Sequence, residues 1–398
     1  PPPPPPPPPP PFFFQADAGI RDPLWSRGLG DVYKRQVLAR AQELEANGRD
    51  IIHLEVGEPD FQAPSEALET VIKSLSKKPA RYTHTQGILP LREEIAKKYR
   101  EDYGVDINPG QILVSSGSSL ALYIAIRILA PAGSEIIVTD PCYACYENMI
   151  RLSGAEPIRI PLKLEEGFEL DMSKVRASIT KRTKAILINS PMNPTGTVFS
   201  KNTLRELAEL EIPVISDEIY ADLNYVSRPH SFMEFSDNCA ALNGFSKFYS
   251  MTGWRLGYLI VPEAWIGTAA KLHQNLMISA NEFVQEAGLK VLQESRETCE
   301  AMKDEFDRRR KFLLGKLKEF DLDPKYQPNS AFYVFLRYRD QKRSSLELAM
   351  EILEKTGVAL TPGVDFGPGG EGFLRFSYAN SQENLERALK RIKESGLI

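Results

Sequence analysis

Cysteine and histidine are both scarce in this sequence. Its 398 residues include four cysteines, too few for the disulfide framework of a secreted domain, so a reducing compartment is expected. Cys142 and Cys145 form one CxxC, but the second CxxC of a zinc site is absent, and coincidence is the better interpretation. The histidines, which show no metal-ligand spacing, are His53, His84, His230 and His273. No metal site is predicted.

Clustered basic charge and long apolar runs are also missing. The chain has 49 Lys and Arg against 53 Asp and Glu, a formal net charge of −4, whereas a nucleic-acid-binding surface needs a clustered basic excess. The basic run at 308–311 lies among many Glu and Asp residues, and we interpret it as the solvated face of a helix. No apolar run is long enough to span a membrane, and no signal peptide is visible. A cytoplasmic protein is expected, with neither nucleic acid nor membrane as a partner.

The first 36 residues lack the periodicity of a helix or a strand, and they open with eleven prolines. One interpretation is a polyproline II arm that docks on a proline-binding partner. The other is a segment foreign to the folded protein. The second is favoured, because a globular pattern begins abruptly with VLARAQELEANG at residue 37. We therefore expect residues 1–36 to be a non-native or disordered leader.

From residue 37 onward, helical patterns alternate with short apolar runs. The seven runs that predict strands between residues 111 and 261 are QILVS, SEIIVTD, EPIRIPL, KAILINS, IPVISD, CAALNGF and LGYLIV. Such runs, apolar without strict alternation, are typical of strands buried on both faces of a parallel sheet. LALYIAIRILA and LRELAEL fit the crossover helices. The sequence therefore predicts an α/β fold with a mostly parallel, seven-stranded type of sheet between helices.

The pattern changes near residue 263. A long helical tract begins there and is followed by the strands SAFYVFLRY and GFLRFSY and by two more helices. That succession is typical of a smaller α+β domain. We expect a leader at 1–36, an N-terminal segment at 37–61 that packs with the small domain, a large cofactor-binding domain at 62–275 and a small C-terminal domain at 276–398.

Polar residues follow several of the predicted strands. In an open parallel sheet, ligands bind outside the carboxyl ends of the strands. After QILV, the turn SSGSS opens a helix. Its N–H groups and the hydroxyls of Ser118 and Ser119 would suit a phosphate, or these serines only cap the helix. After KAILINS, the loop PMNPTG holds Asn193, which either orients a ligand oxygen or belongs to a simple turn.

Charged side chains follow the next two strands. Asp217 ends IPVISD, as a helix N-cap or as a buried acid that needs a cation, and Tyr220 can reach the same space. Lys247 follows ALNGF, and a buried lysine is unfavourable unless paired or neutralised. Arg255, eight residues further on, has a planar guanidinium group that suits a phosphate. Together these groups suit pyridoxal phosphate, which needs a lysine for a Schiff base, an acid at its pyridine nitrogen and a phosphate cradle.

Several motifs resemble those of the class I/II aminotransferases, which are fold type I pyridoxal-phosphate enzymes. SPMNPTG, SDEIY, SK…MTGWRLGY and GFLRFSY occur in the family's order at similar spacing, and GEPDF and RYTHTQGILPLREEIA are similar to family segments. The resemblance covers essentially residues 37–398. It implies the fold type I architecture, bound pyridoxal 5'-phosphate and a homodimer with shared sites.

The resemblance also implies roles for residues around the cofactor. Lys247 matches the lysine that forms the Schiff base and moves the proton between Cα and the cofactor's C4′. Asp217 matches the partner of the pyridine nitrogen, while Tyr220 and Asn193 match the groups that hydrogen-bond the phenolate oxygen. The implied phosphate ligands are Gly117, Ser118, Ser119 and Arg255.

Further positions match family residues at the edge of the site. Tyr143, in DPCYACY, occupies the place of the aromatic residue that stacks on the cofactor ring. Tyr82 resembles the tyrosine that reaches the phosphate from the neighbouring subunit. Arg375, in GFLRFSY, matches the arginine that binds the substrate α-carboxylate bidentately, and the backbone of Gly57 would approach the same carboxylate.

Three departures from the family pattern stand out. Gly244 replaces a serine that many relatives use as a phosphate ligand. The stretch between Asn193 and Asp217 is a few residues short, and the segment before residue 37 is missing or replaced. We expect the protein to bind its cofactor despite these three departures. The properties that they can affect are substrate affinity and turnover.

Transamination between an L-amino acid and a 2-oxo acid is the leading prediction. A carbon–sulfur β-lyase with the same cofactor fits the same residues. A non-catalytic, cofactor-binding sensor is less favoured, because such regulators carry an N-terminal helix-turn-helix and residues 1–36 contain none. Ser119 stands where an aspartate-specific subgroup has a lysine for the distal carboxylate. Neutral or aromatic amino acids are therefore the expected donors, with a dicarboxylate such as 2-oxoglutarate as acceptor.

Overall fold

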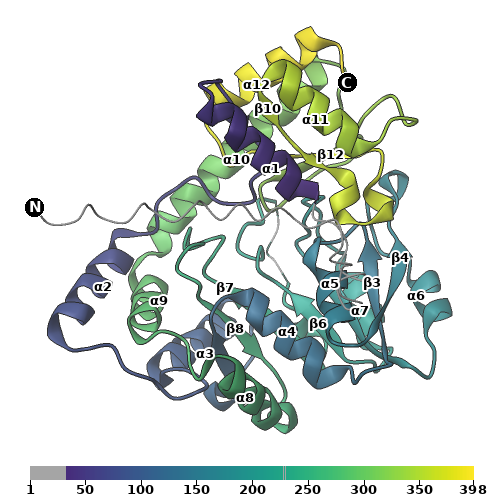
Figure 1. Ribbon diagram of the computed structural model, residues 1–398. Coiled ribbons are helices and arrows are strands. Elements are labelled where there is room, and N and C mark those ends of the chain that lie inside the picture. Colours follow the sequence, from purple (N-terminus) through teal and green to yellow (C-terminus); the bar gives the residue numbers. More distant parts are fainter. Residues whose placement is uncertain (1–32, 227, 229) are drawn as a thin grey trace, which may run out of the picture.

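The computed structural model describes residues 33–226, 228 and 230–398 (Figure 1). Most of the predicted leader therefore lies outside the described residues. The helix expected from residue 37 begins inside that leader, because α1 spans Tyr33–Ala46. This start agrees with the high helix propensity of the KRQ that precedes Val37. Val37 and Ala41 are fully buried, so α1 is part of the core.

A seven-stranded mixed sheet forms the centre of the large domain, with the spatial order β2-β8-β7-β6-β5-β3-β4. β8 runs antiparallel to both of its neighbours, and the other pairs are parallel. The strands are β2 (Ile112–Ser115), β3 (Glu135–Asp140), β4 (Glu156–Pro161), β5 (Thr183–Asn189), β6 (Val214–Asp217), β7 (Cys239–Gly244) and β8 (Gly257–Ile260). All seven predicted strands are therefore present.

The edge strand β4 differs from the expected burial on both faces. Pro157 and Ile160 are buried, but Glu156, Arg159 and Pro161 are exposed. Because β4 has a neighbouring strand on one side only, its charged side chains can reach solvent.

Helices cover both faces of this sheet (Figure 1). On one face lie α4 (Ser118–Leu129), α5 (Cys145–Leu152) and α8 (Glu263–Met277), and on the other lie α6 (Met172–Ser178) and α7 (Lys201–Ala208). Val138 packs with the first group and its neighbour Ile137 with the second, because successive side chains of a strand point to opposite faces. The layers are those of the predicted α/β fold.

The small domain contains two further sheets. One is antiparallel with the order β11-β12-β9, and in the other β1 pairs in parallel with β10. The second pairing joins the N-terminal segment to the small domain. The elements are β1 (Ile52–His53), β9 (Tyr333–Arg337), β10 (Val358–Ala359), β11 (Thr361–Pro362), β12 (Phe373–Ser377), α10 (Arg296–Glu319), α11 (Ser345–Thr356) and α12 (Gln382–Ser395).

The long helical tract after residue 263 is divided into three helices. Ile278, with a φ of 65°, ends α8, and Ser295 separates α9 (Glu282–Glu294) from α10. α9 packs on two helices of the large domain, α2 (Ser65–Lys77) and α3 (Leu89–Tyr103). We therefore propose that the domain boundary falls near Ser295 rather than at residue 275.

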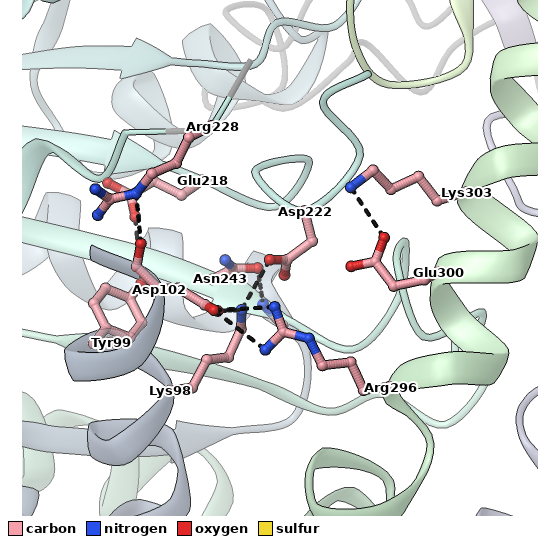
Figure 2. Close-up of polar contacts among 11 residues, drawn as sticks. Lys98, Tyr99, Asp102, Glu218, Asp222, Arg228, Asn243, Arg296, Glu300 and Lys303 are labelled. Carbon is pink, nitrogen blue, oxygen red and sulfur yellow. Dashed lines mark hydrogen bonds and ion pairs between the residues drawn. The ribbon is translucent and has the colours of Figure 1, made fainter. Parts of the chain in front are cut away.

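An ionic cluster, largely buried except at Arg296, links α3, the loop after β6 and the start of α10 (Figure 2). Lys98 Nζ lies 2.5 Å from Asp102 Oδ2 and 2.8 Å from Asp222 Oδ1, and the lysine side chain is 11% exposed. Arg296 Nη2 lies 3.3 Å from Asp102 Oδ1. The carboxylates neutralise a lysine that would be costly to bury alone, and they connect the large domain to the first residue of α10.

The basic run at 308–311 is only in part the solvated helix face that its composition predicted, since the side chains of Arg308 and Lys311 are 64% and 68% exposed. Arg309 and Arg310 are only 7% and 6% exposed. Arg309 donates from Nη1 to Asp60 at 2.7 Å and from Nε to Glu305 at 2.9 Å. These carboxylates compensate the burial. The prediction is therefore wrong for Arg309 and Arg310 alone, because charge density along a sequence does not say which way each side chain faces.

The remaining short helices are of the 3₁₀ type. In the described part of the chain they are Pro109–Gln111, Leu164–Glu166, Phe232–Glu234, Gly363–Phe366 and Pro368–Gly370. None of the described helices combines the length and apolar character needed to cross a membrane. Within the same residues, no group of three or more His, Cys, Asp or Glu side chains is placed to hold a metal ion.

Candidate active site

Residues of both domains line a cavity of about 380 Å³ at the carboxyl ends of the large sheet's strands. The predicted site residues that line it are Gly57, Ser118, Ser119, Tyr143, Asn193, Asp217, Tyr220, Lys247, Arg255 and Arg375. Gly117 immediately precedes Ser118 at the start of α4. The fold therefore brings together residues that are far apart in the sequence.

Lys247 follows β7 and is half-buried. Its Nζ donates to the carbonyl O of Gly57 at 2.6 Å and lies 5.8 Å from the ring centres of Tyr220 and Phe332. The amine therefore lies where the N-terminal segment, the large domain and the small domain meet in the cavity wall.

Asp217 is the last residue of β6 and is 6% exposed. Tyr146 Oη donates to its Oδ2 at 2.7 Å, and the N–H of Ile219 donates to its Oδ1 at 3.2 Å. Burial raises the pKa of this carboxyl to about 6, although these hydrogen bonds and Lys247 act to lower it. A carboxylate in this setting would stabilise a protonated ring nitrogen placed beside it.

An anion seat lies at the N-terminus of α4. Gly117 precedes the helix with a φ of 89°, and a Cβ there would lie 2.4 Å from Arg255 Nη2. The guanidinium therefore lies directly against the backbone that opens α4, whose N–H groups and dipole favour an anion. Arg255 Nη1 donates to the carbonyl O of Thr252 at 3.1 Å, which fixes the direction of the side chain.

Arg375 of β12 is a buried cation, 2% exposed, whose hydrogen-bond partners in the described residues are all neutral. Its Nη1 donates to Asn193 Oδ1 at 2.9 Å, and its Nη2 donates to the carbonyl O of Glu55 at 2.7 Å and to Thr361 Oγ1 at 3.1 Å. The guanidinium lies 4.3 Å from the ring centre of Tyr333. A buried cation without a carboxylate partner, facing a cavity, is suited to a ligand carboxylate.

Tyr333 is a site residue that the sequence analysis missed. Its Oη lies 2.9 Å from Tyr220 Oη, and burial raises the pKa of both phenols. Its place could be found only from strand pairing. Phe335 pairs with Arg375, so Tyr333, two residues earlier, shares their face. Other cavity residues that were missed are Leu38, Val56, Glu58, Leu122, Tyr146, Asn189, Ile219, Ser246 and Thr252.

The two remaining predicted tyrosines lie in different places. Tyr143 lines the cavity and packs edge-on against Tyr146, with ring centres 5.4 Å apart. Tyr82 lies between α2 and α3, is 79% exposed and is not among the residues that line the cavity of its own chain. Within one chain, the structure does not bring Tyr82 to the site.

Gly244 has a steric explanation. A Cβ at this position would lie 2.9 Å from the carbonyl O of Leu256 and 3.0 Å from Cα of Gly257. β7 and β8 approach too closely for a side chain, so a serine ligand has no room here. The stretch between Asn193 and Asp217 retains a helix, α7, of 8 residues.

Comparisons with known proteins show the family of the chain. Residues 49–392 match the family model of aminotransferase class I and II. A (5-formylfuran-3-yl)methyl phosphate transaminase of Methanocaldococcus jannaschii is 42% identical over 363 residues, 90% of this chain and 95% of the relative. A probable aspartate aminotransferase of the same organism is 38% identical over 358 residues, 87% of this chain and 93% of the relative. The chain belongs to the class I and II aminotransferases.

Solved structures of aminotransferases share the fold. One from Methanococcus jannaschii, described as similar in its active site to kynurenine aminotransferases, has a TM-score of 0.86 and 40% identity, covering 94% of this chain and 99% of that chain. Thermus thermophilus aspartate aminotransferase with maleate has a TM-score of 0.88 and 35% identity, covering 93% and 98%. The fold type I prediction is confirmed.

Enzymes of this class and fold use pyridoxal phosphate, and the cavity suits that cofactor. It offers an amine at Lys247, a buried acid at Asp217 and an anion seat at Gly117 and Arg255. The protein is a pyridoxal-phosphate-dependent aminotransferase. The lyase and sensor alternatives are not favoured, because the relatives compared above are named aminotransferases or transaminases.

Proposed function

We propose that Lys247 is the residue on which this aminotransferase performs its chemistry. The observation that carries the proposal is one cavity in which the Lys247 amine lies among a buried acid, an anion seat and a buried cation. When bound, pyridoxal phosphate supplies an electron sink for charge that develops at the substrate Cα. With the cofactor bound, the Lys247 amine would hold it covalently and, as a general base, would move the proton between the substrate Cα and the cofactor's C4′.

The surrounding residues bind and orient. Asp217 would hold the proton on the pyridine nitrogen, and Tyr220 and Asn193 would hydrogen-bond the phenolate oxygen. Arg375, with the backbone of Gly57, holds the substrate α-carboxylate. The residues that would hold the phosphate are Gly117, Ser118, Ser119 and Arg255, and Tyr143 would stack on the ring. The buried, largely neutral surroundings of these groups strengthen each charged contact.

Reduction with borohydride tests the assignment of Lys247. Treatment of the holoenzyme should fix the cofactor on Lys247, which peptide mass spectrometry identifies. The label should be absent from Lys247→Ala and unchanged in Lys271→Ala, a control at an exposed lysine of α8. A label on a different lysine of the unaltered protein would contradict the proposal.

We also propose that two copies of this chain form a dimer with shared sites. Thr83, next to Tyr82, donates from its N–H to Ser279 Oγ at 3.2 Å, so Tyr82 borders both α2 and the end of α8. Exposed apolar side chains lie on α2, at the end of α8 and just after it, namely Leu68, Ile72, Leu75, Leu276, Met277 and Ile278. Such side chains are suited to contact with a second copy, which would carry Tyr82 to the phosphate of the other subunit.

Subunit mixing tests the dimer. Lys247→Ala and Tyr82→Ala chains should each have little activity alone. Co-expressed, they should recover it, because a mixed dimer has one site with both residues intact. Ile72→Glu should give a monomer in light scattering. A monomeric wild-type protein, or no recovery on mixing, would contradict shared sites.

For the substrate, we propose a neutral or aromatic L-amino acid as donor and a 2-oxo acid as acceptor. The cationic residues of this chain that line the cavity are Lys247, Arg255 and Arg375. All three are assigned to the cofactor or the α-carboxylate, so this subunit leaves no cation for a distal carboxylate. Rates with single amino acids test this. A higher kcat/KM for aspartate than for phenylalanine and alanine would contradict it.

We propose a cytoplasmic location. Support comes from the four cysteines, which are all free thiols, as a reducing compartment requires. Cell fractionation with an antibody against the chain tests this, and recovery in a secreted fraction would contradict it.

A further inference from the structure

A histidine with two carboxylates lies behind the Arg375 site. His53 of β1 has its Nδ1 2.8 Å from Glu55 Oε1 and its Nε2 3.6 Å from Glu45 Oε2 of α1. The Glu55 side chain is fully buried and that of His53 is 27% exposed. Both ring nitrogens face a carboxylate, and both can donate only when the ring is protonated, because neutral imidazole carries one N–H.

The backbone of Glu55 is a hydrogen-bond partner of Arg375. Its carbonyl O accepts a hydrogen bond from Arg375 Nη2 at 2.7 Å and another from Thr361 Oγ1 at 3.0 Å. His53 holds the side chain of the same residue. The position of Glu55 therefore bears on where the Arg375 guanidinium points.

The charge of His53 matters because Glu55 is buried. Glu55 Oε2 has no hydrogen-bond partner in the described part of the chain, and the cation beside Oε1 is His53. A buried carboxylate that loses its cation is strongly unfavourable. Loss of the His53 proton therefore favours movement of Glu55, and with it of the carbonyl that holds Arg375.

We propose that protonated His53 is a positioning residue for substrate binding, which with Glu55 fixes β1 so that the Glu55 carbonyl aims Arg375 at the substrate carboxylate. His53 is not among the residues that line the cavity. This inference rests on the proposed function, because Arg375 is there assigned to the α-carboxylate. Its consequence is weaker carboxylate binding once His53 is neutral, with an unchanged proton-transfer step.

α1 stays bound to α11 whether His53 is protonated or neutral. Its Arg40 Nε lies 2.5 Å from Glu354 Oε1 of α11, and this ion pair does not depend on His53. Leu38 of α1, which lines the cavity, therefore stays in place when His53 loses its proton. The effect is confined to β1 and Arg375, so KM changes rather than the fold.

The sign of the pH dependence follows from the groups that face His53. Glu55, the larger cause, and Glu45 raise the pKa of His53 above 6.5, against the opposing effect of burial. Two further neighbours are uncharged, since β10 places Ala359 opposite His53 and Asn380 donates an amide N–H to its carbonyl O. A raised pKa means that the stabilising pair is complete below about pH 6.5 and is lost as pH rises through the folded pKa.

The experiment measures KM and kcat of the holoenzyme for its 2-oxo acid, which has no amine to titrate, between pH 6 and 9. The donor is the amino acid with the highest kcat/KM in the panel described above. Wild type should show a KM that rises severalfold with pH while kcat stays within about twofold. His53→Gln should show a high KM throughout that range. The matched control is His230→Gln, because His230 pairs with Glu234 at 3.1 Å, away from the cavity, and it should behave as wild type.

A second variant keeps the test decisive if His53→Gln does not fold. Glu55→Gln removes the buried charge and should flatten the KM profile at its low-pH value. The pKa of His53, followed by NMR, should fall in the same variant. KM profiles of His53→Gln or Glu55→Gln that parallel wild type would overturn the inference.

Arg375→Lys separates this failure from failure of the proposed function. If it raises KM while the His53 and Glu55 variants do not alter the profile, only the positioning role is wrong. If Arg375→Lys leaves KM unchanged, the assignment of Arg375 to the substrate carboxylate is itself wrong.

Discussion

At the scale of single residues, the cavity holds charges that the chain itself leaves partly uncompensated. Asp217 is buried with a raised pKa, and the buried Arg375 has neutral hydrogen-bond partners. Ligands of opposite charge supply the missing partners, so binding and electrostatics favour the same arrangement. The hydroxyl groups of Tyr220 and Tyr333, which line the same cavity as these charges, are hydrogen-bonded to each other.

Tyr333→Phe removes the hydroxyl that lies 2.9 Å from Tyr220 Oη. We expect turnover to fall about tenfold, or ~1.4 kcal/mol, because Tyr220 loses the partner that orients its phenol. Tyr220→Phe should cost at least as much, and the double variant should cost no more than Tyr220→Phe. Steady-state kinetics of the three variants measures this. Additive losses would contradict the coupling of the two phenols.

At the scale of elements, local patterns were good predictors and long-range contacts were not. The apolar runs predicted all seven strands of the large sheet, since burial on both faces leaves a strong local signal. They did not predict the antiparallel direction of β8, because pairing direction depends on contacts far along the chain. The helix ends at Ile278 and Ser295 were also not predicted, since neither residue is a strong helix breaker.

The close approach of β7 and β8 gives a prediction about Gly244. Gly244→Ser, which restores the residue of many relatives, should lower stability by about 1–3 kcal/mol, because its Cβ would meet the backbone of Leu256 and Gly257. Gly253→Ser is the matched control, since nothing lies within 4 Å of a Cβ there. Thermal unfolding compares the two variants. An unchanged Tm with tighter cofactor binding in Gly244→Ser would contradict the steric explanation.

The ionic cluster between α3 and α10 gives a second prediction at this scale. Lys98→Met should lower the free energy of unfolding by about 3 kcal/mol, because it leaves Asp102 and Asp222 without their shared cation. Lys97→Met, at a side chain that is 56% exposed on the same helix, should change it by less than about 0.5 kcal/mol. Denaturant unfolding measures both variants, and equal stabilities would refute a structural role for the cluster.

At the scale of the whole molecule, the site is where the two domains meet. The predicted residues of the large domain stand at strand ends, so topology alone placed Asn193, Asp217 and Lys247 together. Tyr333 could not be placed in this way, because it enters from the small domain and depends on the pairing of β9 with β12. Topology could not place Tyr82 at the site either, since its proposed role requires a second copy of the chain.

Stability against pH is a property of the whole molecule to which Glu218 contributes. This fully buried carboxylate accepts a hydrogen bond from Tyr99 Oη at 3.3 Å (Figure 2). It also accepts hydrogen bonds from Ser231 Oγ at 3.1 Å and from the N–H of Phe232 at 2.9 Å. Burial nevertheless raises its pKa to about 7 from 4.5. The protonated form is therefore favoured by folding, and this contribution is present below pH 4.5 and lost as pH rises through 7.

Glu218→Gln tests that contribution, because the amide keeps the shape and does not titrate. Between pH 4 and 8, its stability relative to wild type should rise by about 3 kcal/mol. Denaturant unfolding of the cofactor-free proteins at several pH values gives the difference. A difference that is constant with pH would show that Glu218 does not titrate in this range.

A visible absorption spectrum tests whether this aminotransferase works through Lys247. Protein saturated with pyridoxal phosphate is recorded before and after addition of a single L-amino acid, without an acceptor. In wild type we expect loss of the visible band of lysine-bound cofactor together with release of the matching 2-oxo acid; in Lys247→Ala we expect no such band at any stage and no release of the oxo acid. A band that persists in Lys247→Ala, or release of ammonia with the oxo acid, would contradict it.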